Sequence, residues 1–323
     1  KTVGDKRVIC GLSGGVDSSV AAWLLREEGW EGVGVTLRLF SPGDDAAPEV
    51  CRFLGMPHVF FDARQLFEER VLSPFRRAYA RGETPSPCVG CNAALKFGLA
   101  WEVARSLPGV SFIATGHYAR ILHRPEGVRL ARAQDLRRDQ SAFLYALSPE
   151  VLPRTLFPLG ELSKEEVRAR ARRAGLPTAL RRDSMDLCFA GEGGYRSVLD
   201  PALLHRPGPI LDEEGHELGI HPGIVHFTPG QRQGLGIASP VPLYVLRVDP
   251  FRQALVVGPW ERALAREVEA RRPRLLAPDL IFPGARVWGK VRAPGPLTPG
   301  TVELLTEDRL RCRFDEPVFA PAP

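Results

Sequence analysis

Residues 8–19 read VICGLSGGVDSS, and this stretch predicts how the chain begins to fold. An apolar run rich in β-branched residues precedes two adjacent glycines, and apolar residues then recur at helical spacing from Ser18 to Glu28. The pattern indicates a buried strand, a tight loop and a helix. Gly14 and Gly15 allow the loop to turn sharply and to expose backbone N–H groups beside the positive end of the helix. Such a loop suits phosphate, and Asp17 within it is then expected to carry Mg²⁺.

Strands and helices alternate after this loop. Strands are expected over 32–40, 59–61 and 110–114, and helices over 65–80, 93–106 and from Asp44 or Asp45 to Leu54. This alternation predicts a doubly wound α/β domain with a parallel sheet, in which ligands bind at the carboxyl ends of the strands. A hairpin is expected over 119–131. Residues 144–173 are helical in outline, with a capping box from Ser163 to Glu166.

A cysteine-bearing segment, residues 84–92, reads TPSPCVGCN. Its two prolines predict an extended backbone, and Asn92 is expected to cap the helix over 93–106. Cys91 would then lie at the positive end of that helix, near Lys96, and both features favour its thiolate. Six cysteines spread through a long chain argue against a disulfide framework and for metal or redox chemistry at a clustered pair. Three others are expected to be apolar fillers: Cys10, Cys51 and Cys312.

From about Arg206 the pattern changes to short β-like runs separated by proline and glycine, which predicts a small β domain. The runs cover 209–212, 223–227, 242–248 and 254–257. Residues 227–236 read FTPGQRQGLG, a polar loop with spaced glycines. A further β segment follows from about Glu269, and the chain is expected to end near 319–321 without a closing strand.

Composition is that of a globular protein with two or three domains: 323 residues, 44% hydrophobic and 25% charged. The net charge of +5 comes almost entirely from arginine, which permits a polyanionic partner, although a biased genomic composition would give the same excess. Arginines at 168, 170, 172 and 173 read first as a solvated helix face and second as an RNA contact. No apolar run approaches bilayer length and the first strand begins near the first residue, so we expect a cytoplasmic protein without a signal peptide.

The loop over 13–18, SGGVDS, lacks the lysine of the Walker pattern. It resembles the PP-loop of the ATP pyrophosphatases, which cleave ATP to AMP and pyrophosphate. Five further motifs follow in order: TPSPCVGCN (84–92), ATGHY (114–118), DQSAFL (139–144), DSMDLCF (183–189) and TPGQRQGLG (228–236). Together they resemble the tRNA-specific 2-thiouridylase family, whose members replace O2 of the wobble uridine in tRNA with sulfur.

This resemblance implies a fold and a nucleotide site. It implies a PP-loop catalytic domain over 1–205, a central β domain over 206–268 and a β-barrel-like domain over 269–323 that lacks its final strands. Mg²⁺ would be held by Asp17. ATP would be bound by Gly11, Leu12, Ser13, Gly14, Gly15, Val16, Asp17, Ser18, Leu37 and Gly116.

The resemblance also implies how the substrate is handled. Cys91 would lie beside the target base, and Cys188 would be its sulfur-handling partner. The target uridine would be lined by Ser86, Pro87 and Cys88. The tRNA, through its anticodon stem-loop, would contact Arg138, Asp139 and Gln140. A donor protein or sulfide would supply the sulfur, and neither DNA nor a membrane is an expected partner.

Two sulfur routes stay open. In the first, Cys188 carries a persulfide and Cys91 completes the exchange, leaving a disulfide. In the second, Cys88, Cys91 and Cys188 hold a [4Fe–4S] cluster with one open iron. Many family members carry aspartate where this chain has Cys88, and three soft ligands favour the cluster. A structural zinc would want a fourth ligand, and no histidine is adjacent in sequence to these cysteines.

Three other functions fit the sequence less well. Another PP-loop tRNA sulfurtransferase, acting on cytidine or a different uridine, is not expected to carry the 228–236 motif followed by a β domain. An amide-forming ligase such as GMP synthetase has no use for three cysteines. A non-catalytic metal-containing RNA-binding module is disfavoured by the intact loop over 13–18. His117 and His226 are expected to be structural, and the loop near 41–47 is shorter than is usual in the family.

Overall fold

The computed structural model describes residues 6–40, 46–183, 187–191, 193–292 and 295–322, and the chain folds into two compact units. Unit 1 comprises residues 1–72 and 87–187, and unit 2 comprises residues 73–86 and 188–323. Three features expected from sequence lie outside the described residues: the chain break over 41–43, the helix cap at Asp44 or Asp45, and residues 184–186 of the 183–189 motif. Among the described residues no helix is both long and apolar enough to cross a membrane.

Unit 1 is built on a sheet whose strands all run parallel, in the order β3-β2-β1-β4-β7. The strands are β1 (Arg7–Gly11), β2 (Glu31–Arg38), β3 (His58–Asp62), β4 (Phe112–Ala114) and β7 (Thr155–Leu156). The central strand β1 is apolar and buried, with Val8 and Ile9 at 0% exposure. The predicted doubly wound α/β fold is confirmed.

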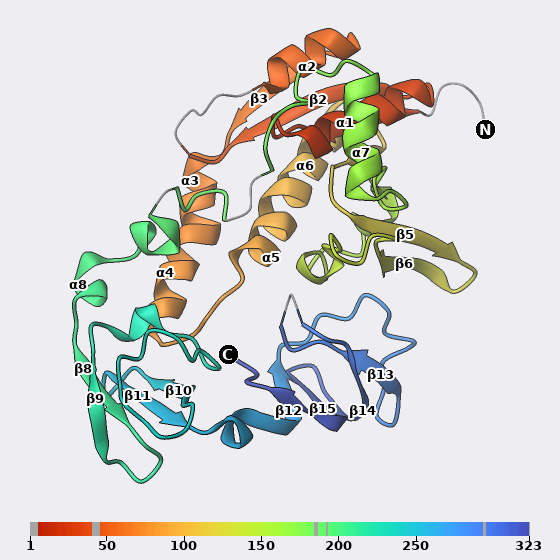
Figure 1. Cartoon of the computed structure of the whole chain (residues 1–323). Helices are drawn as coiled ribbons and strands as arrows, with labels where there is room; N and C mark the ends of the chain where they lie inside the picture. Colours follow the sequence, from red (N-terminus) through yellow and green to blue (C-terminus); the bar gives the residue numbers. More distant parts are fainter. Residues whose placement is uncertain (1–5, 41–45, 184–186, 192, 293–294, 323) are drawn as a thin grey trace. The chain divides into compact units, whose positions relative to one another are not determined.

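Helices connect and follow the strands of unit 1 along the chain. They are α1 (Val16–Glu27), α2 (Ala47–Leu54), α3 (Arg64–Phe67), α5 (Pro87–Cys91), α6 (Ala100–Ser106) and α7 (Lys164–Arg173), with π-helical segments η2 (Glu68–Leu72) and η3 (Asn92–Leu99). Figure 1 shows α7 lying beside α1. These two helices share one buried cluster, in which Val16 and Val20 pack with Val167 and Ala171. The packing fixes the first turn of α1 against the first turn of α7.

The region over 144–173 differs from the prediction of continuous helix. It follows the short helix η4 (Ser141–Phe143) and holds the short helix η5 (Leu152–Arg154), then β7, and only then α7. Prolines at 149, 153 and 158 interrupt the helix, because proline removes a backbone donor and clashes with the preceding turn. The capping box is confirmed, since Glu166 N donates to Ser163 Oγ and Ser163 N donates to Glu166 Oε2. The predicted hairpin is also present, as β5 (Ala119–Arg124) and β6 (Gly127–Arg132).

Unit 2 contains a first sheet in the order β10-β11-β8-β9. Its strands are β8 (Gly208–Leu211), β9 (Glu217–His221), β10 (Tyr244–Asp249) and β11 (Ala254–Gly258), and its helices are α4 (Ser73–Ala80), η6 (Gly194–Val198), α8 (Pro201–Leu204) and η7 (Ile224–His226). The predicted strand over 223–227 is wrong, because η7 occupies it as a short 3₁₀ turn. Strand preference depends on packing against a paired neighbour, which the sequence of a short run does not supply.

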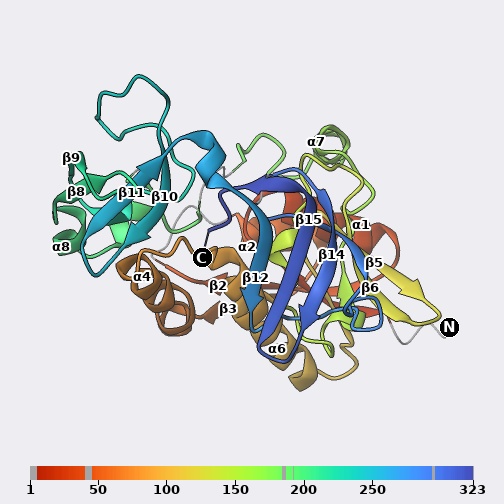
Figure 2. The ribbon, with the colours of Figure 1, turned by 90° about the horizontal axis from the view of Figure 1, so that it is seen from below.

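The second sheet of unit 2 is antiparallel, in the order β12-β15-β14-β13 (Figure 2). It consists of β12 (Leu264–Arg271), β13 (Arg286–Gly289), β14 (Thr298–Leu305) and β15 (Arg309–Phe319), and it follows η8 (Trp260–Ala263). The segment therefore starts at Leu264, and its last strand pairs with β12 as far as Phe319. The sheet is open, with β12 and β13 as its edges among the described residues, and the absence of final barrel strands stays a prediction.

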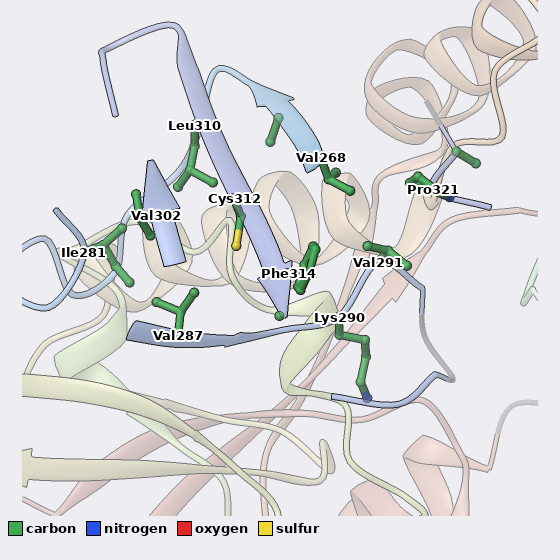
Figure 3. A pocket seen from close by; sticks show the side chains of 13 residues that line it. Val268, Ile281, Val287, Lys290, Val291, Val302, Leu310, Cys312, Phe314 and Pro321 are labelled. Atoms are coloured by element: carbon green, nitrogen blue, oxygen red, sulfur yellow. The ribbon is translucent and has the colours of Figure 1, made fainter. Parts of the chain in front are cut away.

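One face of this second sheet is apolar. Cys312, Phe314 and Val318 form its buried cluster, with Val268 and Leu310 packed against it. Figure 3 shows Val268, Leu310 and Phe314 around a hollow of about 270 Å³. Cys312 lies in this apolar surface, as expected for a small filler residue. Cys10 and Cys51 are likewise buried, in the core beside β1.

Candidate active site

The loop between β1 and α1 has the geometry expected of a phosphate-binding turn. Gly14 adopts a left-handed conformation with φ of 73°, which favours glycine. Ser18 Oγ lies 3.2 Å from Ser13 N and donates to Gly15 O at 3.1 Å, so the first turn of α1 holds the loop. The helix begins at Val16, immediately after the two glycines. Backbone N–H groups and the positive helix end are therefore brought together, as an anion site requires.

The end of the neighbouring strand β4 completes this turn. A Cβ atom added at Gly116 would lie 2.6 Å from Ser18 N and 2.7 Å from the carbonyl carbon of Asp17. The backbone after β4 thus approaches the first turn of α1 closely enough that only glycine fits. Gly11 meets Thr115 at ordinary contact distance. Leu37 lies at the carboxyl end of β2, paired with Phe61. The residues predicted for ATP therefore share one edge of the sheet.

Asp17 has partners that the sequence did not predict. Its two carboxylate oxygens accept hydrogen bonds from Lys164 Nζ at 2.7 and 2.8 Å, and Oδ1 also accepts from Tyr118 Oη at 2.9 Å. Burial and the negative charge of Asp17 raise the pKa of Tyr118, so it donates as a neutral phenol. Lys164 is only 5% exposed, which is unusual for a lysine. The sequence did contain a signal for such a partner. Lys164 follows the capping Ser163 directly, and a cation in the first turn of a helix is unfavourable next to the helix dipole unless an anion compensates it.

A second carboxylate shares the same lysine. Lys164 Nζ lies 2.9 Å from Asp183 Oδ1, and Arg168 Nη2 donates to that oxygen at 2.6 Å. Arg138 lies 3.7 Å from the other oxygen. Burial acts to raise the pKa of Asp183, but the hydrogen bond and charge of Lys164, with the two arginines, lower it overall. Asp183 is thus an anion in this cluster, and Lys164 joins it to Asp17.

Whether Asp17 can bind a magnesium ion depends on how many of its acceptor positions are already used by hydrogen bonds. A carboxylate offers about four lone-pair positions, and Lys164 and Tyr118 take three of them. Mg²⁺ in phosphate sites takes one or two carboxylates together with substrate phosphates and water. Asp17, with Asp183 across the same ammonium, would supply such oxygen ligands if the lysine gave up part of its contact.

The cysteine-bearing turn is helical earlier than predicted. The helix begins at Pro87, so Cys91 lies at the end of α5 rather than at a helix N-terminus, and Asn92 lies inside the helix rather than capping it. Proline is well tolerated at the first helical position, which explains why it did not keep the segment extended. Asn92 is 2% exposed, and its Nδ2 donates to Phe143 O at 3.0 Å. The expected position of Cys91 at the positive end of a helix is therefore wrong.

The helical turn brings two thiols to one side of α5. Cys88 and Cys91 are three residues apart, which places them on neighbouring positions of the helix surface. Burial raises the pKa of Cys88, and the charge of Lys96 acts in the opposite direction. Cys91 is 5% exposed. Unit 1 thus offers a thiol pair from one turn, the first half of the predicted sulfur site.

Comparisons with known proteins decide the family. A family model described as "tRNA methyl transferase HUP domain" matches residues 6–192, and one described as "tRNA methyl transferase PRC-barrel domain" matches residues 196–259. The tRNA-specific 2-thiouridylase MnmA of Synechococcus sp. strain JA-3-3Ab is 42% identical over 98% of this chain and 88% of that protein. That of Moorella thermoacetica is 41% identical over 97% of this chain and 92% of that protein. The chain belongs to the tRNA-specific 2-thiouridylase family. The predicted family is confirmed.

The remaining thiol expected from the family resemblance lies in the other unit. Cys188 is exposed and is the first residue of the second segment of unit 2, whereas Cys88 and Cys91 belong to unit 1. Ser86 ends the first segment of unit 2, and Pro87 begins the next segment of unit 1. The roles of these residues toward the target base stay predictions.

The residues predicted to contact tRNA differ in how much they are free to do so. The Asp139 carboxylate accepts from Ala133 N at 3.0 Å and from Ser141 Oγ at 2.9 Å, and its side chain is 6% exposed. Gln140 Oε1 accepts from Tyr118 N at 2.9 Å. Both side chains thus hold the loop after the hairpin. Arg138 is 42% exposed, so it is the member of the three that faces solvent.

The two histidines have structural surroundings. His117 Nδ1 lies 2.8 Å from Thr115 Oγ1, and its ring packs against Phe97 and Phe157. Burial, with the charge of Lys96, lowers the pKa of His117 to about 3, so it stays neutral. His226 Nε2 lies 2.8 Å from Leu204 O. Packing and backbone bonding of these rings agree with a structural role.

Proposed function

We propose that this chain, as a tRNA-uridine 2-sulfurtransferase, uses ATP to activate the wobble uridine of tRNA and replaces its O2 with sulfur. Membership of the 2-thiouridylase family supports the reaction class. The single observation that carries the ATP step is the turn after β1, where Gly14 is left-handed and Gly116 approaches Ser18. Methyl transfer, the activity named in the family-model description, has no use for such a phosphate turn.

The first half-reaction makes O2 a leaving group. O2 of the uracil attacks the α-phosphorus of ATP, the bond to the β-phosphate oxygen breaks, and pyrophosphate leaves. The N–H groups of the loop over 13–18 stabilise the charge that develops on the phosphates. Mg²⁺, held at Asp17, would add further positive charge when bound. The base must leave the anticodon stack to reach the site, which favours a target in an exposed loop.

The second half-reaction delivers sulfur. Cys188, which is exposed, receives a sulfane sulfur from a donor protein and becomes a persulfide. The terminal sulfur attacks C2 of the adenylated base, and AMP leaves with the oxygen. The Cys91 thiolate then attacks Sγ of Cys188, the S–S bond to the new thiocarbonyl breaks, and a Cys91–Cys188 disulfide forms. The two thiols supply the two electrons that reduce the sulfane sulfur, and an external dithiol must reduce the disulfide before the next turnover.

The [4Fe–4S] hypothesis uses the same thiols and stays an alternative for the sulfur step. Cys88 and Cys91 on one helical turn, with Cys188, would be its ligands. Neither the fold nor the family comparisons support a cluster over the persulfide. Sulfide would then be the donor, and all three cysteines would be required together.

The tRNA contacts form the last part of the proposal. Ser86, Pro87 and Cys88 would line the target uridine, and Arg138 would reach the backbone of the anticodon stem-loop. Asp139 and Gln140 would act by holding the loop that carries Arg138. The proposed domain limits are 1–205, 206–268 and 269–323, and the proposed compartment is the cytoplasm.

Single-turnover thiolation of an anticodon stem-loop RNA tests the proposal. Wild-type chain is prepared with and without iron, and supplied either with a persulfide donor or with free sulfide. We expect iron-free protein and a persulfide donor to support thiolation, Cys91→Ala and Cys188→Ala to abolish it, and Cys88→Ala to retain it. Cys312→Ala removes a thiol from the apolar sheet of unit 2 and is the matched control.

Other outcomes have definite meanings. Activity that requires iron and is lost in Cys88→Ala together with visible cluster absorbance would replace the persulfide route by the cluster. RNA-stimulated pyrophosphate release without thiolation of a wobble uridine would point to another base. Absence of pyrophosphate release from folded protein would contradict the enzymatic function and favour an RNA-binding module.

A further inference from the structure

Lys164 occupies an unusual place for a lysine. It begins α7, it is 5% exposed, and its ammonium contacts both oxygens of Asp17 and one oxygen of Asp183. An ammonium has three protons, and these contacts employ them all. A buried ion pair contributes little net stability, because desolvation offsets most of its attraction. Stability alone is therefore a weak reason for a lysine at this position.

The position matches that of a bridging cation. Two carboxylates from different parts of unit 1 face one positive charge, immediately beside the first turn of α1 and its phosphate-binding loop. Carboxylate oxygens are the ligands that Mg²⁺ prefers. In the Walker loop a lysine follows the second glycine, whereas this loop has none, and Lys164 arrives from a helix 147 residues later. The chain thus supplies its own cation where nucleotide-bound metal is expected.

The surroundings distinguish the two carboxylates. Asp183 has Arg168 at 2.6 Å and Arg138 at 3.7 Å besides the lysine, so it stays compensated if Lys164 shifts. Asp17 has Lys164 as its charged partner among the described residues, together with the neutral hydroxyl of Tyr118. The Asp17 side chain is also the more exposed of the two, at 33% against 20%. Asp17 is therefore the carboxylate that can exchange its cation.

We propose that Lys164 is a positioning residue that neutralises Asp17 in the nucleotide-free protein and yields Asp17 to the divalent cation that arrives with ATP. Lys164 keeps its contact with Asp183 during this exchange. The proposal rests on the ATP step of the proposed function, and it adds that free Mg²⁺ cannot compete with the resident ammonium. Metal binding is thereby made dependent on nucleotide.

Binding of Mn²⁺, a spectroscopic substitute for Mg²⁺, tests this without RNA, sulfur donor or turnover. Electron paramagnetic resonance of the full chain counts bound Mn²⁺ in the absence of nucleotide. We expect wild type to bind weakly and Lys164→Gln to bind at least about tenfold more tightly, because two carboxylates then face each other without their shared cation. In thermal unfolding, Mn²⁺ should restore part of the Tm lost in Lys164→Gln and leave wild type unchanged.

Two variants make the result specific. Arg168→Gln removes the same charge one turn further along α7, but its guanidinium contacts Asp183 and not Asp17, so it should not gain Mn²⁺ affinity. The double variant Lys164→Gln with Asp17→Asn should lose the gain. Equal Mn²⁺ binding by wild type and Lys164→Gln, or an equal gain in Arg168→Gln, would overturn the proposal. A gain at Lys164 without uridine thiolation would keep this inference and reject the proposed function.

Discussion

Two regions of the molecule pair their charges in contrasting ways. At the first turn of α1, Lys164 is buried between Asp17 and Asp183. On the second sheet of unit 2, neighbouring strands carry a ladder of ion pairs whose arginine side chains are 41–60% exposed. The ladder consists of Arg309, Arg311 and Arg313 with Glu267, Glu269 and Glu303. Both regions contain several ion pairs, but the larger contribution to the unfolding free energy should come from the buried cluster.

The difference arises from solvent. Exposed pairs gain little over water, and they lose side-chain freedom when they form. In the cluster around Lys164 the lysine is 5% exposed and the side chains of Asp17 and Asp183 are 33% and 20% exposed, so water replaces a missing partner less readily and the loss of one charge leaves another poorly compensated. Burial, rather than the count of contacts, should therefore predict which charges the protein cannot lose.

Lys164→Gln should have the largest effect. Two carboxylates would lose their shared cation, and breaking a buried pair costs about 3 kcal/mol or more of unfolding free energy. Urea denaturation with matched m-values measures it. A loss below about 1 kcal/mol, the range of exposed pairs, would remove the distinction between the two regions.

Gly116→Ala extends the comparison from charge to packing. The new Cβ would lie 2.6 Å from Ser18 N, and backbone atoms cannot rotate away. We expect a loss of about 2 kcal/mol, within the range for overpacked sites, and weaker ATP binding because the phosphate turn is displaced. Gly219→Ala in unit 2 is the control, since its Cβ would meet the Ile237 side-chain methyl at 2.7 Å, which can move. Urea denaturation and calorimetric ATP titration of both variants measure these effects. Equal losses of unfolding free energy and of ATP affinity in the two variants would contradict the prediction.

The sequence predicted the region around Gly116 better than the one around Lys164. The strand, glycine loop and helix over 8–28 are contiguous, and their periodicity and glycines are local signals. Lys164 and Asp17 are brought together only by the packing of α7 on α1, which no local pattern contains. A capping box located the start of α7 correctly, but it gave no information about what the first residue of the helix would contact.

The cysteine turn shows a different limit. Pro87 is compatible both with an extended segment and with the first position of a helix, and the structure has the helix. The six-residue shift of the helix start moved Cys91 from the positive end of a helix to the end of its first short segment. The prediction that a helix N-terminus stabilises the Cys91 thiolate therefore fails. The expectation that Cys88 and Cys91 lie close together on the chain still holds, because both are on one turn of α5.

Lowering the pH should reveal a smaller difference in stability between the buried cluster and the exposed ion pairs than the substitutions do. The pKa of Asp183 is lowered overall by Lys164, Arg168 and Arg138 against the effect of burial. A group with a depressed folded pKa stabilises the protein above its unfolded pKa, near 4, and that stability is lost as pH falls through the folded pKa. Below about pH 4, the unfolding free energy of Asp183→Asn should fall less steeply with decreasing pH than that of wild type. The difference in slope should correspond to at most about one proton taken up on unfolding.

The matched control for the acid experiment is Asp315→Asn. The pKa of Asp315 is also lowered, chiefly by a hydrogen bond from Arg286, but its side chain is 44% exposed. Urea denaturation across the acid range compares the two slopes. An equally large change at Asp315 would show that exposure does not govern the pH dependence.

Arg313→Gln should have the smallest effect. Arg313 lies 3.4 Å from Glu267 and 3.7 Å from Glu303, and its side chain is 59% exposed. Exposed pairs contribute about 0–1 kcal/mol, so the unfolding free energy should change by less than about 0.5 kcal/mol. The same denaturation assay in low and high salt measures it, since any contribution should disappear as salt screens the charges. A loss as large as that of Lys164→Gln would mean that the strands of the ladder act as a network, and the comparison would then rest on cooperation between charges rather than on burial.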